Sequence, residues 1–93
     1  MILIIGRFQV HSERMAAFQV FAREVIEEER HVEGCVGFDI LQDVTRADHF
    51  VMMEQWRDQT ALNQHVGSDA YRRNETKMNS FMVNDAKWVE YDV

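Results

Sequence analysis

The extended segments of this chain are apolar on both faces, and this feature restricts the possible folds more than any other. In residues 1–10, Ile2 and Ile4 alternate with Leu3 and Ile5, and strand side chains alternate between the two faces of a sheet. An antiparallel sheet with one face in water normally alternates apolar and polar residues instead. The 93 residues leave no segment for a second layer. We therefore expect a second copy to cover the open face, giving a homodimer.

The hydrophobic period predicts the order strand, helix, strand, strand, broken helix and strand. Strands are expected at residues 1–10, 35–44, 47–57 and 86–93, a long helix at 13–32, and the broken helix between 58 and 82. This order is typical of the α+β split βαβ plan, also called ferredoxin-like, in which both helices cover one face of an antiparallel sheet. We expect a single domain over residues 1–93.

Polar residues and one glycine mark the expected helix ends. Ser12 precedes the first helix, Asp58 or Thr60 the second and Ser68 the third. Each of these side chains can accept a hydrogen bond from a free amide of the first helical turn. Gly34 fits the stop of the first helix, because glycine adopts the left-handed conformation at no steric cost.

Composition excludes several classes of partner. The net charge is −6, which disfavours binding to nucleic acid or to an anionic membrane, and no apolar run reaches the length of a membrane helix. The acidic run Glu27–Glu29 is expected to face solvent. Cys35 is the single cysteine, so no internal disulfide can form, which fits a cytoplasmic location. We interpret Cys35 as a small buried residue rather than a nucleophile.

Several motifs resemble the antibiotic biosynthesis monooxygenase family. Residues 33–43, EGCVGFDILQD, resemble its signature EPGC-x-x-Y/F-x-V-L-x-D, and residues 50–56 resemble its third strand, which ends in Glu-x-Trp. Residues 61–66 and 68–71 resemble its A-L-x-x-H-L helix and its S-x-x-F/Y turn. The resemblance implies a dimeric α/β barrel with the helices outside. Members of the family include cofactor-independent oxygenases of phenols, quinol monooxygenases, haem-degrading enzymes and an isomerase branch.

His65 is the candidate catalytic residue. It follows Leu62 by one helical turn, so both side chains are expected to point toward the sheet. A partly buried imidazole can accept a proton near neutral pH. Removing a proton from a phenol or hydroquinol increases its reducing power toward oxygen. The alternative interpretation is a hydrogen-bonded core histidine that supports its helix.

The resemblance also implies a substrate cavity beside His65. It places Trp56 in the cavity wall, where an indole can stack on an aromatic substrate, although a core tryptophan is an equal alternative. Phenol-oxidising members carry an asparagine and a tyrosine where this chain has Met52 and Leu62. Other polar side chains would have to replace them. The predicted substrate-binding residues are Trp56, Phe38, Met52, Asn63, Tyr71 and Arg72.

No metal or cofactor is predicted. The four histidines lack the spacing of metal ligands. The haem-degrading branch has a tryptophan in place of His65 and an axial histidine near Glu75, and a carboxylate is a poor haem ligand. The sequence thus predicts a cofactor-independent monooxygenase, an oxidoreductase acting on a quinol or phenolic small molecule. The alternatives are a non-catalytic ligand-binding or accessory dimer and an isomerase on the same fold.

Overall fold

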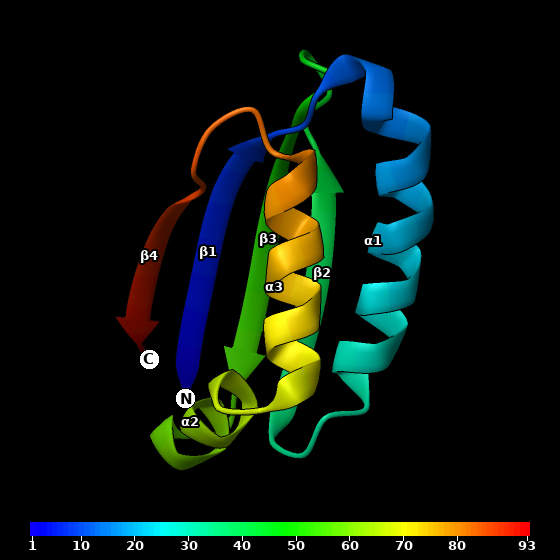
Figure 1. Cartoon of the computed structure of the whole chain (residues 1–93). Helices are drawn as coiled ribbons and strands as arrows, with labels where there is room; N and C mark the ends of the chain where they lie inside the picture. The colour runs from blue at the N-terminus through cyan, green and yellow to red at the C-terminus, as the bar shows by residue number, and fades with distance from the viewer.

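The computed structural model describes all of residues 1–93 and confirms the ferredoxin-like α+β plan (Figure 1). The elements are β1 (Ile2–Gln9), η1 (Ser12–Arg14), α1 (Met15–Arg30), β2 (Cys35–Gln42), β3 (His49–Trp56), α2 (Gln59–Val66), α3 (Asp69–Phe81) and β4 (Lys87–Asp92). The strands form one sheet in the order β2-β3-β1-β4. All neighbouring strands run antiparallel.

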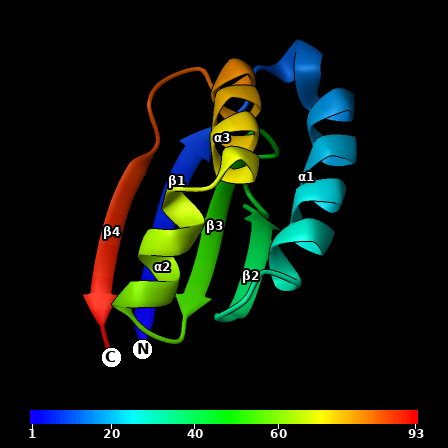
Figure 2. The same cartoon turned by 60° about the horizontal axis from the view of Figure 1, so that its bottom comes forward.

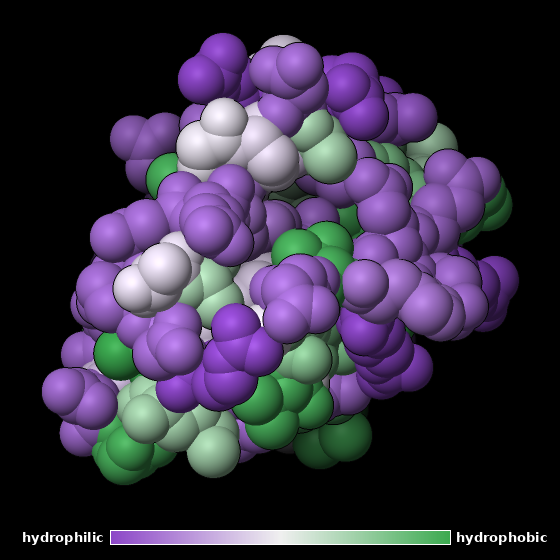
Figure 3. All heavy atoms as spheres, turned by 90° about the horizontal axis from the view of Figure 1, so that it is seen from below, coloured by the Kyte–Doolittle hydropathy of each residue, from purple (hydrophilic) through white to green (hydrophobic).

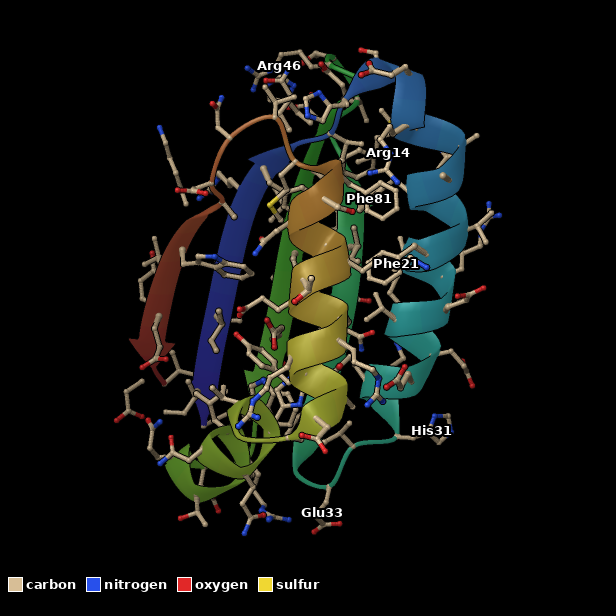
Figure 4. The ribbon with its side chains drawn as sticks, in the orientation of Figure 1. Arg14, Phe21, His31, Glu33, Arg46 and Phe81 are labelled. Carbon is tan, nitrogen blue, oxygen red and sulfur yellow. The ribbon has the colours of Figure 1, made fainter.

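The helices all lie on one face of this sheet (Figures 1 and 2). Even-numbered residues of β1 and β3 point toward them, and Phe8 and Phe50 on this face are buried. Phe18 of α1 completes the centre of the core, with its ring centroid 4.8 Å from that of Phe50. Figure 4 shows Phe21 of α1 and Phe81 of α3 facing each other, and their ring centroids are 5.5 Å apart. Aromatic packing therefore joins both long helices to the sheet.

Two of the expected N-caps are confirmed. Asp58 accepts a hydrogen bond from the Ala61 amide at 2.9 Å, and Ser68 accepts one from the Tyr71 amide at 3.2 Å. Gly34 has a φ of +85°, but α1 already ends at Arg30 with His31 as its C-cap, so Gly34 shapes the turn before β2 rather than the stop of the helix. A Cβ at Gly34 would also lie 2.4 Å from the Cβ of Ala61, so no larger residue fits where α2 crosses this loop.

The expectation for Ser12 was wrong, as were several element ends. Ser12 lies inside the short 3₁₀ turn η1, and α1 begins at Met15 without a side-chain cap. The strand β2 ends at Gln42 because the Asp43 carboxylate accepts hydrogen bonds from the Thr45 amide and hydroxyl, both at 2.7 Å. The link to β3 is therefore longer than expected. These local hydrogen bonds compete with the strand ladder.

The other face of the sheet carries apolar side chains and no covering element. On this face Ile5 pairs with Met53 of β3 on one side and with Val89 of β4 on the other. We define the open-face patch as Leu3, Ile5, Val51, Met53, Val89 and Tyr91, none of which is fully buried. Figure 3, seen from the α2 end, shows apolar surface along its lower edge, away from the helices. None of the helices combines the length and apolar composition needed to cross a lipid bilayer.

Candidate functional site

A pocket of about 540 Å³ lies between the helices and the sheet. Its volume is in the range of roughly 300–1,000 Å³ typical of small-molecule sites. Each of the three α-helices and four strands contributes to the wall. The residues that matter most for its chemistry are Glu29, Phe38, Met52, Glu54, His65, Tyr71, Glu75, Trp88 and Glu90.

A buried pair of ionisable side chains lies at the inner end of this pocket. His65 Nε2 is 3.2 Å from Glu29 Oε2, and both side chains are 4% exposed. The expectation that the whole run Glu27–Glu29 faces solvent was therefore wrong for its last member. Glu29 follows Val25 by four residues, so it continues the inward stripe of α1, while Glu28 is exposed.

Burial disfavours the charged form of both members of the pair. The pKa of Glu29 rises from 4.5 to about 7, mainly through burial and further through the charge of Glu54. Asn74 opposes this rise by donating a hydrogen bond to Glu29 Oε1 at 3.4 Å. Burial lowers the pKa of His65. Glu29 Oε2 has no hydrogen-bond partner, although His65 Nε2 lies 3.2 Å away. The pair therefore favours a neutral imidazole beside a carboxyl group that titrates near neutral pH.

Trp56 packs against His65 and is not part of the pocket wall. Its side chain has 0% exposure and does not line the pocket. The indole stacks on the His65 ring at 4.4 Å, and its Nε1–H donates to Glu54 Oε1 at 3.1 Å. Burial raises the pKa of Glu54, and this hydrogen bond lowers it. Trp56 therefore positions His65 and Glu54, and its N–H is already used.

Tyr71 and Trp88 form aromatic walls of the pocket. The Tyr71 ring meets His65 edge-on at 5.1 Å, and burial and a hydrogen bond with Glu75 raise the pKa of its hydroxyl. Trp88 of β4 lies across Gly6 of β1, where an added Cβ would come 2.4 Å from the indole ring. The glycine thus allows a large aromatic surface, 51% exposed, to border the pocket.

The structure brings together some of the residues predicted from the sequence. His65, Phe38, Met52 and Tyr71 line the pocket. Two other predicted residues follow inward-facing ones on their helices and are themselves exposed to solvent. They are Asn63, whose side chain accepts a hydrogen bond from Gln59 at 2.9 Å, and Arg72, which pairs with Asp69 at 3.8 Å.

Sequence reasoning assigned no site role to Glu29, Glu54 or Trp88. The sequence could have pointed to Glu54, because it is an acid on a strand face that is otherwise occupied by Phe50, Met52 and Trp56. The sequence could not have pointed to Trp88, since the position of its side chain over Gly6 depends on the pairing of β1 with β4.

We expect the natural chain to lose stability between about pH 4.5 and pH 7, and Glu29→Gln to lack this loss. Unfolded Glu29 loses its proton near pH 4.5, whereas folded Glu29 keeps it until about pH 7. Between these pH values the folded state binds more protons than the unfolded state. The free energy of unfolding therefore falls with rising pH, by up to about 3 kcal/mol in total. The glutamine variant should lack this fall.

Urea denaturation between about pH 5 and pH 8 measures this difference. Burial lowers the pKa of His65, so His65 makes the stability rise with pH below its usual pKa. Both chains contain His65, and the difference between their stabilities therefore reports on Glu29. Glu24→Gln, at an exposed position of α1 whose charge is not among those that raise the pKa of Glu29, is the control and should keep the natural pH dependence. An equal pH slope in Glu29→Gln would contradict the prediction.

The structure is an α+β domain with a ferredoxin-like sheet and a buried acid–imidazole pair in a pocket with aromatic walls. The sequence pattern of the family described as Antibiotic biosynthesis monooxygenase matches residues 1–75. The chain therefore belongs to the antibiotic biosynthesis monooxygenase family.

Two relatives are similar to this chain in sequence. The protein named "Putative monooxygenase YcnE" of Bacillus subtilis is 29% identical over 65 residues, which cover 70% of this chain. The "Uncharacterized protein sll1783" of Synechocystis is 23% identical over 92 residues, or 99% of this chain. The aligned parts span 68% of the first relative and 63% of the second.

Solved structures match nearly the whole fold. A crystal structure of an antibiotic biosynthesis monooxygenase has a TM-score of 0.90 and 26% identity, and the match covers 100% of this chain and 98% of that one. SnoaB of Streptomyces nogalater, described as a cofactor-independent oxygenase, has a TM-score of 0.87 at 15% identity. This second match covers 99% of this chain and 91% of SnoaB, and it shows a shared fold.

Proposed function

We propose that the chain is a cofactor-independent monooxygenase that oxidises a small quinol or phenolic aromatic, acting as a cytoplasmic homodimer. The observation that carries this proposal is the buried His65–Glu29 pair in a pocket with aromatic walls. Family membership supports an oxygenase activity, as do the name of YcnE and the description of SnoaB.

The pair fits the first step of such a reaction. Neutral His65 accepts the proton of the substrate hydroxyl, and the adjacent Glu29 carboxylate stabilises the imidazolium that results. The substrate anion is a stronger reductant than the neutral quinol and transfers electrons to oxygen. Overall, the quinol and O₂ give a hydroxyquinone and water. One oxygen atom enters a ring C–H bond, and the other leaves as water with the two hydrogens that the substrate loses.

Oxygen consumption by chelator-treated protein with menadiol as substrate tests the proposal. We expect consumption above the rate of menadiol oxidation in buffer, with a hydroxylated quinone detected by mass spectrometry. If menadiol binds and no product forms, the chain is a binding or accessory dimer instead. The same acid–base pair could move a proton within a carbonyl substrate, and turnover under nitrogen would identify an isomerase.

The homodimer is proposed from the open-face patch. Its centre, Ile5 with Met53 and Val89, is a continuous apolar stripe across three strands. Contiguous apolar surface on a sheet is typical of protein interfaces. A second copy packed through the same face would convert two half-covered sheets into one two-sheet core, as the family's dimeric barrel does.

A further inference from the structure

The charged residues that line the pocket are almost all of one sign. Five carboxylates border it, contributed by Glu29, Glu54, Glu75, Asp85 and Glu90, and no lysine or arginine does. The chain contains ten lysines and arginines, yet all of them lie outside the wall. Glu29 and Glu54 are buried, where the charged form is disfavoured, whereas Glu75, Asp85 and Glu90 are exposed to solvent. The pocket therefore has a negative potential that comes mainly from the three exposed acids and that water screens in part.

One oxygen atom of these carboxyl groups has no hydrogen-bond partner inside the protein. Glu29 Oε2 is buried without a hydrogen bond, although a buried acceptor normally has one. His65 Nε2 lies 3.2 Å from this atom and carries no proton when the proton of the neutral ring is on the other nitrogen. The atom is therefore available to a hydrogen-bond donor that a ligand brings into the pocket.

The aromatic wall offers a second means of holding a positive charge. Trp88 presents an indole face beside the pocket, and Glu90 follows two positions later on the same face of β4. Indole faces attract cations through the negative charge above the ring. Tyr71, hydrogen-bonded with Glu75, lies on the helix side of the same pocket.

We propose that the pocket selects phenolic aromatics that carry a protonated amine and rejects those that carry a carboxylate. The ammonium group supplies N–H donors to the carboxylates and compensates their charge, whereas an anion adds a like charge that nothing neutralises. This inference rests on the proposed function in one respect, that the pocket is the substrate site.

Three catechols that differ only at the end of one side arm test this selectivity: dopamine, 4-ethylcatechol and dihydrocaffeate. The arm ends in an ammonium, a methyl and a carboxylate group, respectively. We expect calorimetry under nitrogen at neutral pH to show dopamine binding at least about tenfold more tightly than dihydrocaffeate, with 4-ethylcatechol between them. Added salt should reduce the difference.

The double variant Glu75→Gln/Glu90→Gln should reduce the preference for dopamine by at least about threefold. Glu24→Gln/Glu28→Gln removes the same charge from exposed positions of α1 outside the pocket and should leave the preference unchanged. Circular dichroism establishes that both variants are folded. Equal or tighter binding of dihydrocaffeate would overturn the inference, and so would failure of all three catechols to bind.

The two proposals fail in different ways. If the catechols bind in the expected order and none is oxidised, the monooxygenase proposal is wrong and the charge selectivity stands. If oxygen is consumed fastest with dihydrocaffeate at low concentration, the selectivity is wrong and the monooxygenase proposal stands.

Discussion

His65→Gln should lower the rate of menadiol-dependent oxygen consumption by about 10²–10⁴-fold, the usual contribution of a general base. Glutamine retains an amide that can reach Glu29, but it cannot accept a proton at neutral pH. The substrate can still enter, because the side chain is similar in size. We therefore expect the loss in kcat, with KM changed little.

The pH profile and a matched variant separate this role from a structural one. His49 also lies next to a carboxylate, 2.8 Å from Asp48, but it lies outside the pocket. His49→Gln should therefore keep the natural rate. Activity of the natural chain should rise with pH as the pair loses protons, and Glu29→Gln should lack the part of this rise near pH 7. An unchanged rate in folded His65→Gln would remove His65 from the mechanism.

Met53→Asp should convert the proposed homodimer into a monomer at micromolar concentration. Met53 pairs with Ile5 at the centre of the open-face patch, and the two-fold symmetry of a dimer would bring two aspartates into one apolar interface. A buried charge without a partner costs several kcal/mol, so we expect dimerisation to weaken by at least about 100-fold. Sedimentation velocity measures the change.

Val44→Asp is the control for this substitution. Val44 is fully exposed in the turn between β2 and β3, and the change from an apolar residue to aspartate is comparable there. This variant should sediment as the natural chain does. A natural chain that is already monomeric at micromolar concentration would contradict the homodimer itself.

Residues whose role depends on near neighbours in the chain could be predicted. Asp58 and Ser68 cap helices through amides three residues later. Gly34 takes a left-handed φ that other residues avoid. His65 points inward because it shares a helix face with Leu62. In each of these cases the determining interaction spans one turn of chain.

The chemistry of the pocket could be predicted only in part, because its contacts join distant segments. Helical period places Glu29 on the inward face of α1, yet only the packing of α1 against α2 brings it within 3.2 Å of His65. Trp56 was expected either in the pocket wall or in the core, and packing places it in the core against His65, with its N–H donated to Glu54.

The sequence by itself determined the order of the elements, the ferredoxin-like plan, the sheet with two apolar faces and the inward direction of His65. These properties follow from hydrophobic period and capping, which act over a few residues. Only the tertiary structure decided the acidic lining of the pocket, the partner of His65 and the place of Trp88 over Gly6. Strand pairing and helix packing set these contacts, and they depend on how whole surfaces fit together rather than on any local pattern.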